Sequence, residues 1–261
     1  MKAMFTTLSK TPPQFFSQNK PPYLVELKYD GEDIIIVRML NGEIYALNKY
    51  NRIYEDLPFF KNLPKEPFIA RAEMYADEGK SGSLYNLKKA LKEGSVKAAI
   101  HDILYYQNTE LTAKPLKERK QILQSFPHAI QPLGEAQNPQ QIQQLFQKAV
   151  EQGYEGVVVK PINSTYRDNA WLKLKKAETY EVQITARKIG KRSFKMEIDG
   201  RHVGDISSGI TPHQAQILAT LPTTHTDGEY EYFTKPIPAL VEAQEFVGEK
   251  MRHPRLIKFL L

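Results

Sequence analysis

The sequence predicts an α+β domain followed by a small β-barrel, and the distribution of strand-like and helix-like segments leads to this expectation. Up to about residue 177, strand-like segments bounded by turn residues are mixed with helices. Beyond that point, short strand-like segments accompany a single short helix, which is typical of a small barrel such as an OB-fold. We therefore expect two domains, residues 1–177 and residues 178–261.

The strands of the first domain are indicated by apolar runs between turn signals. They are expected at residues 23–29, 32–40, 43–48, 67–75, 96–106, 155–160 and 170–176. Two favoured turn dipeptides, Asp30-Gly31 and Asn41-Gly42, join the first three strands.

Three helices are expected in the first domain. One covers residues 83–93, and a second begins at Pro115. The third has the clearest boundaries, because Asn138 can cap it, Pro139 suits its first position and Gly153 ends it.

The second domain is expected to be mostly strands, with one helix at residues 211–220 that Thr211 caps. Its strands are predicted at residues 179–189, 193–199, 201–206, 229–234 and 239–247. Basic residues outnumber acidic ones between Lys160 and Arg201. This excess indicates either an ordinary solvated surface or a groove that follows a phosphate backbone.

Composition narrows the functional classes. The 261 residues include no cysteine, which excludes disulfides, cysteine–zinc sites and a thiol nucleophile. No apolar stretch approaches the roughly 20 residues of a membrane span, and residues 1–23 lack the apolar core of a secretion signal. We therefore expect a cytoplasmic protein without a membrane partner. The net charge of +6 suggests a polyanionic partner.

Lys28 is the residue on which the functional prediction depends. It ends an apolar run and is followed by Tyr-Asp-Gly, so it lies near a strand end from which a side chain can project into a cleft. Lys-x-Asp-Gly alone is weak evidence, and further segments must support it. They are "ELKYDG" (26–31), "FIARAEMY" (68–75), "IHDILYYQNTELTAKPLKERKQIL" (100–123), "EGVVVK" (155–160), "YRDNAWLKLK" (166–175) and "HVGDISSGITPHQAQIL" (202–218).

In this order the segments resemble the motifs of ATP-dependent DNA ligases. These enzymes share a nucleotidyltransferase superfamily with RNA ligases and mRNA-capping guanylyltransferases. The resemblance implies a nucleotidyltransferase domain with ATP-grasp-like antiparallel sheets and helices, followed by an OB-fold domain, which together form a minimal ligase. It also implies a monomer that closes on nicked duplex DNA.

By this resemblance, Lys28 attacks the α-phosphate of ATP, expels pyrophosphate and holds AMP. A lysine has an ordinary pKa of about 10.4, so a nucleophilic lysine needs desolvation or nearby cations to be unprotonated at neutral pH. Lys160, Lys173 and Lys175 are the expected cations. Lys173 and Lys175 are two residues apart on a strand and would contact the phosphates from one face.

The remaining predicted residues follow from the same resemblance. Glu73 and Glu155 are expected to hold Mg²⁺ or Mn²⁺, with Glu73 alternatively binding the ribose hydroxyls. Glu26 would read the adenine amino group, and Asp30 would orient the lysine–AMP adduct. His101 would either stack on the base or be a buried core histidine.

Some positions depart from the family pattern, and these leave the acceptor open. Ligases commonly carry an arginine two residues after the motif glycine, but this chain has Asp33. Tyr50 replaces a second expected arginine, for which Lys49 or Arg52 are the candidates. The C-terminal segment lacks the family's Arg-x-Asp-Lys motif. Candidate nucleic-acid contacts are Arg52, Arg187, Lys188, Lys191 and Arg192.

Two alternatives to a nick-sealing DNA ligase therefore stay open. The first is an RNA ligase or capping-type guanylyltransferase, which differs in nucleotide or acceptor. The second is a catalytically silent protein that binds nicks or ends and carries no covalent AMP.

Overall fold

The computed structural model describes residues 12–244 and 246–260, and the chain divides into two compact units, Met1–Lys175 and Lys176–Leu261. Residues 1–11, which belong to the segment predicted to lack a secretion signal, lie outside the described residues. Within the described part, no helix has the length and apolar character needed to cross a bilayer.

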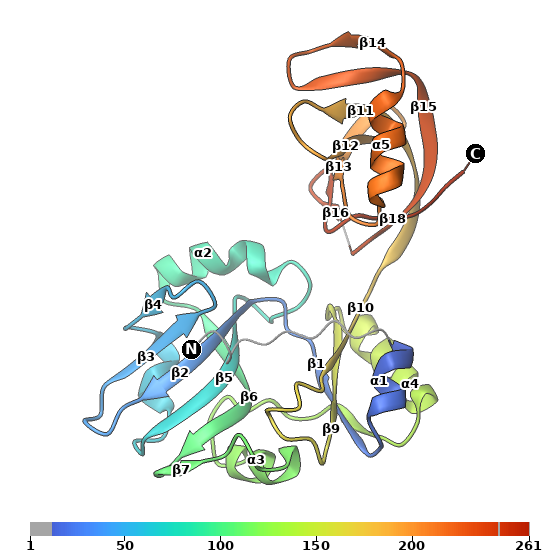
Figure 1. Cartoon of the computed structure of the whole chain (residues 1–261). Helices are drawn as coiled ribbons and strands as arrows, with labels where there is room; N and C mark the ends of the chain where they lie inside the picture. The colour runs from blue at the N-terminus through green and yellow to red at the C-terminus, as the bar shows by residue number, and fades with distance from the viewer. Residues whose placement is uncertain (1–11, 245, 261) are drawn as a thin grey trace. The chain divides into compact units, whose positions relative to one another are not determined.

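Two antiparallel sheets form the first unit (Figure 1). The larger has the order β4-β3-β2-β5-β6-β7, with bounds Ile53–Tyr54, Ile44–Asn48, Glu32–Arg38, Phe68–Tyr75, Lys97–Tyr106 and Thr109–Glu110. The smaller has the order β10-β9-β1-β8, with bounds Leu172–Lys175, Gly156–Pro161, Tyr23–Leu27 and Gly134–Ala136. The expectation of antiparallel sheets with helices is confirmed.

The helices of the first unit are α1 (Pro12–Gln18), α2 (Ser83–Glu93), α3 (Leu116–Leu123) and α4 (Pro139–Glu151), with a 3-10 helix at Pro58–Asn62. The predicted cap of α4 is present, because the Asn138 side chain accepts a hydrogen bond from the Gln141 backbone N–H at 3.0 Å. The sequence did not predict α1. Its Phe15 packs in the core that α4 forms with the smaller sheet.

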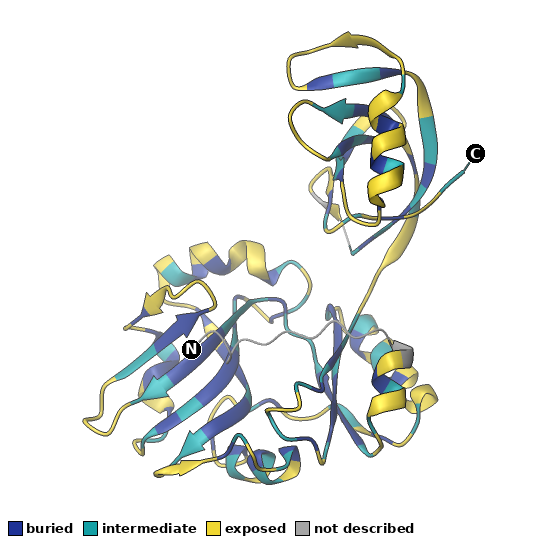
Figure 2. Ribbon diagram, in the orientation of Figure 1, coloured by how far each residue is buried: buried dark blue, intermediate teal, exposed yellow. Residues whose placement is uncertain are grey.

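Each sheet buries one face and turns the other toward polar residues, as strand alternation requires. Ile34, Ala70 and Ile100 of the larger sheet lie in one hydrophobic core. Val157 and Leu172 of the smaller sheet lie in a second core. Figure 2 shows this burial along the strands, whereas the outer turns of α2 are exposed.

The predicted hairpin at Asp30-Gly31 is wrong, because β1 and β2 belong to different sheets. The segment between them crosses over, and the Asp30 N–H donates to the Gly79 carbonyl at 2.9 Å instead of closing a hairpin. Gly31 is required there for space, since a Cβ would lie 2.1 Å from the Met74 carbonyl oxygen of β5. The second predicted turn, at Asn41-Gly42, does join paired strands.

A six-stranded antiparallel sheet forms most of the second unit. Its path is β13-β12-β11-β15-β14, and β18 also pairs with β15, with bounds Arg201–Ile206, Phe194–Ile198, Glu178–Lys188, Tyr230–Ala243, Thr223–Thr226 and Arg255–Phe259. A two-stranded ribbon consists of β16 (Phe246–Val247) and β17 (Lys250–Met251). Helix α5 (Pro212–Thr220) begins with the predicted cap, which Thr211 forms with Gln214 as a reciprocal capping box.

The two strands predicted at 229–234 and 239–247 are in fact one strand, β15, up to Ala243. Pro236 and Pro238 lie in the interval between these two predicted strands, and proline cannot donate to a strand ladder. The structure tolerates Pro236 because the pairing with β11 shifts register between Tyr232 and Ile237, and Pro236 falls in that irregularity.

Candidate active site

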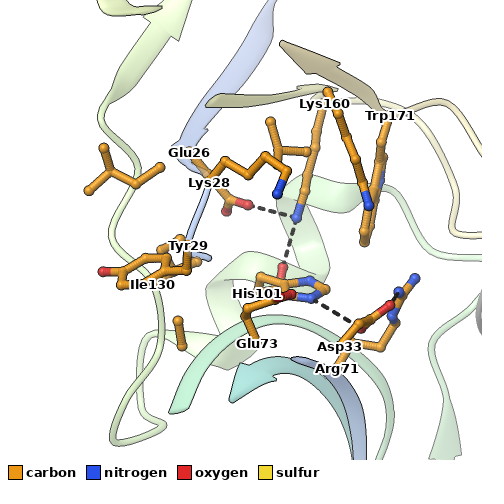
Figure 3. A pocket seen from close by; sticks show the side chains of 14 residues that line it. Glu26, Lys28, Tyr29, Asp33, Arg71, Glu73, His101, Ile130, Lys160 and Trp171 are labelled. Carbon is orange, nitrogen blue, oxygen red and sulfur yellow. Dashed lines mark hydrogen bonds and ion pairs between the residues drawn. The ribbon is translucent and has the colours of Figure 1, made fainter. Parts of the chain in front are cut away.

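A pocket lies between the polar faces of the two sheets of the first unit (Figure 3). The lining residues are Glu26, Leu27, Lys28, Tyr29, Asp33, Arg71, Glu73, Ala99, His101, Ile130, Val158, Lys160, Trp171 and Lys173. Predicted site residues from five separate segments are thus brought together.

Lys28 lies one residue beyond the end of β1, and its side chain enters this pocket with 14% exposure. Its backbone N–H donates to the Gly156 carbonyl at 2.9 Å, which fixes the segment against β9. The ammonium forms an ion pair with Glu155, and Lys175 approaches the other oxygen of that carboxylate at 2.8 Å. Burial would raise the pKa of Glu155, but the two lysines lower it to about 2.

Glycine is required directly after Glu155. Gly156 has φ +150°, and a Cβ there would lie 2.0 Å from the Leu174 carbonyl oxygen of β10. The close approach of β9 and β10 therefore explains the glycine of "EGVVVK".

Asp30 is buried and does not line the pocket. Its carboxylate accepts a hydrogen bond at 2.8 Å from the N–H of Gly82, which precedes α2. Asp30 therefore holds the segment after Lys28 in place, which is a positioning role. The predicted role toward a lysine–AMP adduct stays a prediction.

Glu26 lies at the centre of a buried charge cluster. Its side chain is 1% exposed and forms ion pairs with Lys120 and, at 2.6 Å, with Lys160. Burial would raise the pKa of Glu26, but these two lysines lower it. Burial in turn lowers the pKa of Lys160 to about 8, although Glu26 opposes the shift. The sequence did not predict Lys120, because one lysine on a polar helix face gives no signal.

His101 presents its ring to the pocket between Lys160 and Asp33 (Figure 3). Its backbone carbonyl accepts from Lys160 Nζ at 3.1 Å, and its ring meets Trp171 edge-on at 5.4 Å. Burial lowers the pKa of His101 to about 4, so the imidazole is neutral at physiological pH. A neutral planar ring at the pocket wall is suited to contact a base.

Arg71 is a site residue that the sequence analysis missed. It lies on β5 two residues before Glu73, and both side chains line the pocket. The Arg71 guanidinium forms an ion pair with Asp33 and lies 5.3 Å from the centre of the Trp171 ring. The sequence could have indicated Arg71, because it lies two residues before the predicted site residue Glu73 in "FIARAEMY". Residues two apart on a strand point to the same face.

Lys173 and Lys175 lie in different environments although both belong to β10. Lys173 lines the pocket, and its pKa is lowered by burial and by Lys28. Lys175 is 39% exposed and reaches the site through Glu155. The structure therefore brings Lys173 into the pocket and leaves Lys175 at its margin.

Glu73 and Glu155 are the carboxylates predicted to hold Mg²⁺, and that role stays a prediction. Glu73 lines the pocket, whereas the two oxygens of Glu155 are paired with Lys28 and Lys175. Mg²⁺ commonly takes one or two carboxylates together with substrate phosphates and water. No group of three or more acidic, histidine or cysteine side chains suited to a metal occurs in residues 12–244 and 246–260. Burial and the nearby charge of Asp33 raise the pKa of Glu73 to about 7. A cation bound beside this carboxylate would lower that pKa again.

The raised pKa of Glu73 predicts a pH-dependent stability. Below about pH 4.5 the carboxyl is protonated in both folded and unfolded chains. Between pH 4.5 and 7 only the unfolded chain ionises, so the folded state loses relative stability as the pH rises. In metal-free buffer we expect the wild type to lose about 2 kcal/mol relative to Glu73→Gln between pH 5 and 8. The comparison with the variant is needed because the lowered pKa of His101 stabilises the folded state of both proteins as the pH rises through the same range. Urea unfolding at the two pH values measures this difference. Equal losses in both proteins would contradict it.

The predicted nucleic-acid contacts lie in both units, and several are engaged in internal contacts. Arg187 forms an ion pair with Glu231, and Lys188 pairs with Asp205 at 3.1 Å and Glu229 at 2.7 Å. Lys191 and Arg192 are exposed between β11 and β12, and Arg192 donates to the Ile210 carbonyl. Arg52 is exposed and lies over the Tyr54 ring at 4.9 Å.

Comparison with known proteins decides the family. A family model described as "ATP dependent DNA ligase domain" matches residues 3–175, which is more than half of the chain. The chain belongs to the ATP-dependent DNA ligase family. The chain is 26% identical over 223 residues to a DNA ligase of Saccharolobus solfataricus, and that match covers 71% of this chain and 35% of the relative. It thus spans about a third of the length of the curated DNA ligases that it matches.

Solved structures of DNA ligases share the fold. A Lig E DNA ligase, described in a study of DNA binding with a minimal scaffold, has a TM-score of 0.72 at 14% identity and covers 97% of this chain and 98% of its own. The ligase domain of Mycobacterium tuberculosis LigD has a TM-score of 0.54 at 18% identity, covering 94% and 95%. At these identities the likeness concerns the fold alone. The ligase family predicted from the motifs is confirmed.

Proposed function

We propose that the chain is an ATP-dependent ligase that seals nicks in duplex DNA through a lysyl-AMP intermediate. The observation that carries this proposal is the position of Lys28. Its amine lies in a pocket between two sheets, and Lys160 and Lys173 line the same pocket. Family membership supports the same conclusion.

The first step is self-adenylylation. The unprotonated Lys28 amine attacks the α-phosphorus of ATP, an N–P bond forms, and the bond to the departing pyrophosphate breaks. The amine proton is released to solvent as the phosphoramidate forms. Lys173 supplies positive charge to the phosphate, because phosphoryl transfer depends mainly on positioning and charge neutralisation. Glu155 orients the Lys28 side chain through their ion pair.

The second and third steps use the same pocket. An oxygen of the 5′-phosphate attacks the phosphorus of lysyl-AMP, and the N–P bond breaks. The 3′-hydroxyl then attacks the activated 5′-phosphorus and releases its proton to solvent, so that AMP leaves and a phosphodiester bond forms. His101 would contact the adenine, and Glu26 would read its amino group.

Mg²⁺ or Mn²⁺ belongs to this proposal, and Glu73 and Glu155 would hold it. A divalent cation supplies charge neutralisation for the phosphates when it is bound. Mg²⁺ also favours the ionised form of Glu73, whose pKa burial raises to about 7.

We assign nucleotidyl transfer to residues 1–177, and we assign residues 178–261 as an OB-fold domain. The sheet and single helix α5 of the second unit support the OB-fold assignment. Arg52, Arg187, Lys188, Lys191 and Arg192 would contact the DNA backbone, and that binding would weaken with rising salt. The protein would act as a cytoplasmic monomer.

Labelling with radioactive nucleotides tests the proposal. Purified protein is incubated with Mg²⁺ and ATP or GTP labelled at the α-phosphate, and then receives nicked duplexes with a DNA or RNA strand. We expect label from ATP and sealing of the DNA nick. Preference for GTP would indicate a guanylyltransferase, and preference for the RNA strand would indicate an RNA ligase. Nick binding without any label would indicate a catalytically silent protein.

A further inference from the structure

We propose that Arg71 is a phosphate-binding residue of this pocket and that Asp33 is its positioning residue. The inference rests on the proposed function and adds a cation from β5 to the lysines already described. Its ligand is a phosphate group, which is either the α-phosphate of the nucleotide or the 5′-phosphate of the nick.

The location of Arg71 carries the first part of the argument. Its side chain is 3% exposed and nevertheless lines the pocket that contains Lys28 and Lys173. Burial would lower the pKa of Arg71, but Asp33 and Tyr166 raise it, so the guanidinium is a permanent charge. A buried permanent cation on a pocket wall is suited to an anionic ligand.

The contacts around Arg71 hold its guanidinium in one orientation. Asp33 accepts a hydrogen bond from Nη2, and the Tyr166 hydroxyl accepts one from Nη1 at 3.1 Å. The Trp171 ring lies 5.3 Å from the guanidinium carbon. An arginine supported on three sides can meet a phosphate without much loss of side-chain entropy, because its planar fork is already oriented.

Strand register explains why the cation comes from β5. Asp33 of β2 lies opposite Glu73, so Arg71 is its diagonal neighbour on the same face. The sequence resemblance predicts an arginine at position 33, where this chain has an aspartate. The guanidinium from the neighbouring strand therefore lies beside that position, and Asp33 holds it through their ion pair.

Four cations and three carboxylates, Glu73 among them, line the pocket, so its lining carries a formal charge of +1, which suits an anionic ligand. Three of the lining cations, Lys28, Arg71 and Lys160, form ion pairs with Glu155, Asp33 and Glu26 respectively. Lys173 adds a further positive charge to the wall. A phosphate would meet Lys173 and Arg71 on the faces of opposite sheets, since β10 and β5 belong to different sheets.

The test separates the reaction into three measurements. They are AMP labelling from ATP, transfer of AMP from adenylylated protein to a nick, and sealing of a nick that already carries AMP. Arg71→Met removes the charge, and Arg71→Lys keeps it. Arg38→Met is the matched control, because Arg38 of β2 donates to the Gly42 and Phe60 carbonyls and does not line the pocket.

We expect Arg71→Met to slow at least one step on the order of 100-fold, Arg71→Lys to recover part of that loss, and the control to match the wild type. Loss in the labelling step identifies the α-phosphate as the ligand, and loss confined to the later steps identifies the 5′-phosphate. Rates for Arg71→Met within about threefold of the wild type in all steps would overturn the inference. The inference would also be overturned if Arg71→Met and Arg71→Lys lost equal rate and showed equally lowered melting temperatures, because that result would indicate a purely structural role.

A double-mutant cycle tests the role of Asp33. Asp33→Asn should slow the same step as Arg71→Met, and the double variant should be no slower than Arg71→Met alone, because Asp33 acts through Arg71. Fully additive losses would overturn the positioning role. An unlabelled wild type would overturn the proposed function together with this inference, whereas a labelled wild type beside an unaffected Arg71→Met would overturn this inference alone.

Discussion

Replacing Lys28 by alanine is expected to abolish covalent attachment of AMP, with a loss of at least about a thousandfold in labelling rate. The reason is chemical, because the proposed attacking nitrogen belongs to Lys28, whereas Lys173 is assigned the neutralisation of phosphate charge. Lys160 is bound to Glu26 and to the His101 carbonyl. Lys28→Arg should fail as well, since a guanidinium keeps the charge but is not a nucleophile at neutral pH.

Lys80→Ala is the control for this prediction. Lys80 is 44% exposed, pairs with Glu78 and does not line the pocket, so its variant should label like the wild type. Both Lys28 variants should still seal a nick that already carries AMP, more slowly than the wild type, because that step needs no lysine nucleophile. Retained labelling of Lys28→Ala would show that another residue carries the nucleotide.

The second large effect is expected on stability, at the buried pair of Asp102 and Arg119. Both side chains are 0% exposed, and two hydrogen bonds of 2.7 and 2.9 Å join them. Asp102→Ala leaves the guanidinium buried without its counter-ion. We expect a loss of about 3 to 5 kcal/mol in the free energy of unfolding, measured by urea denaturation.

Two comparisons sharpen the stability prediction. The double variant Asp102→Ala with Arg119→Met should be more stable than Asp102→Ala alone, because it removes the uncompensated charge. Lys89→Ala, which removes an exposed pair with Glu93 on α2, should cost less than about 1 kcal/mol. A loss for Asp102→Ala no larger than that of Lys89→Ala would contradict the account of the pair.

Local signals in the sequence predicted many of the elements. The caps at Asn138 and Thr211 fall where they were expected, because a cap depends on neighbouring residues. Lys28, Glu73 and Lys173 meet in one pocket as the motifs predicted, although Glu73 of β5 and Lys173 of β10 belong to different sheets. The family resemblance was needed to connect segments that lie far apart in the sequence.

Sheet membership could not be predicted in the same way. The Asp30-Gly31 dipeptide favours a hairpin locally, but the close approach of Gly31 to Met74 is a tertiary contact that no local pattern reveals. The joining of two predicted strands into β15 depends on the register shift opposite β11. The pairing of Arg71 with Asp33 likewise depends on which strands lie side by side.

Mapping the attached nucleotide by mass spectrometry tests the central claim most directly. The protein is incubated with ATP and Mg²⁺ and digested, and the modified peptide is fragmented. The account predicts the mass of one AMP on Lys28, which disappears when nicked duplex DNA is added. AMP on a different residue, or no modified peptide from a protein that is folded and binds ATP, would contradict it.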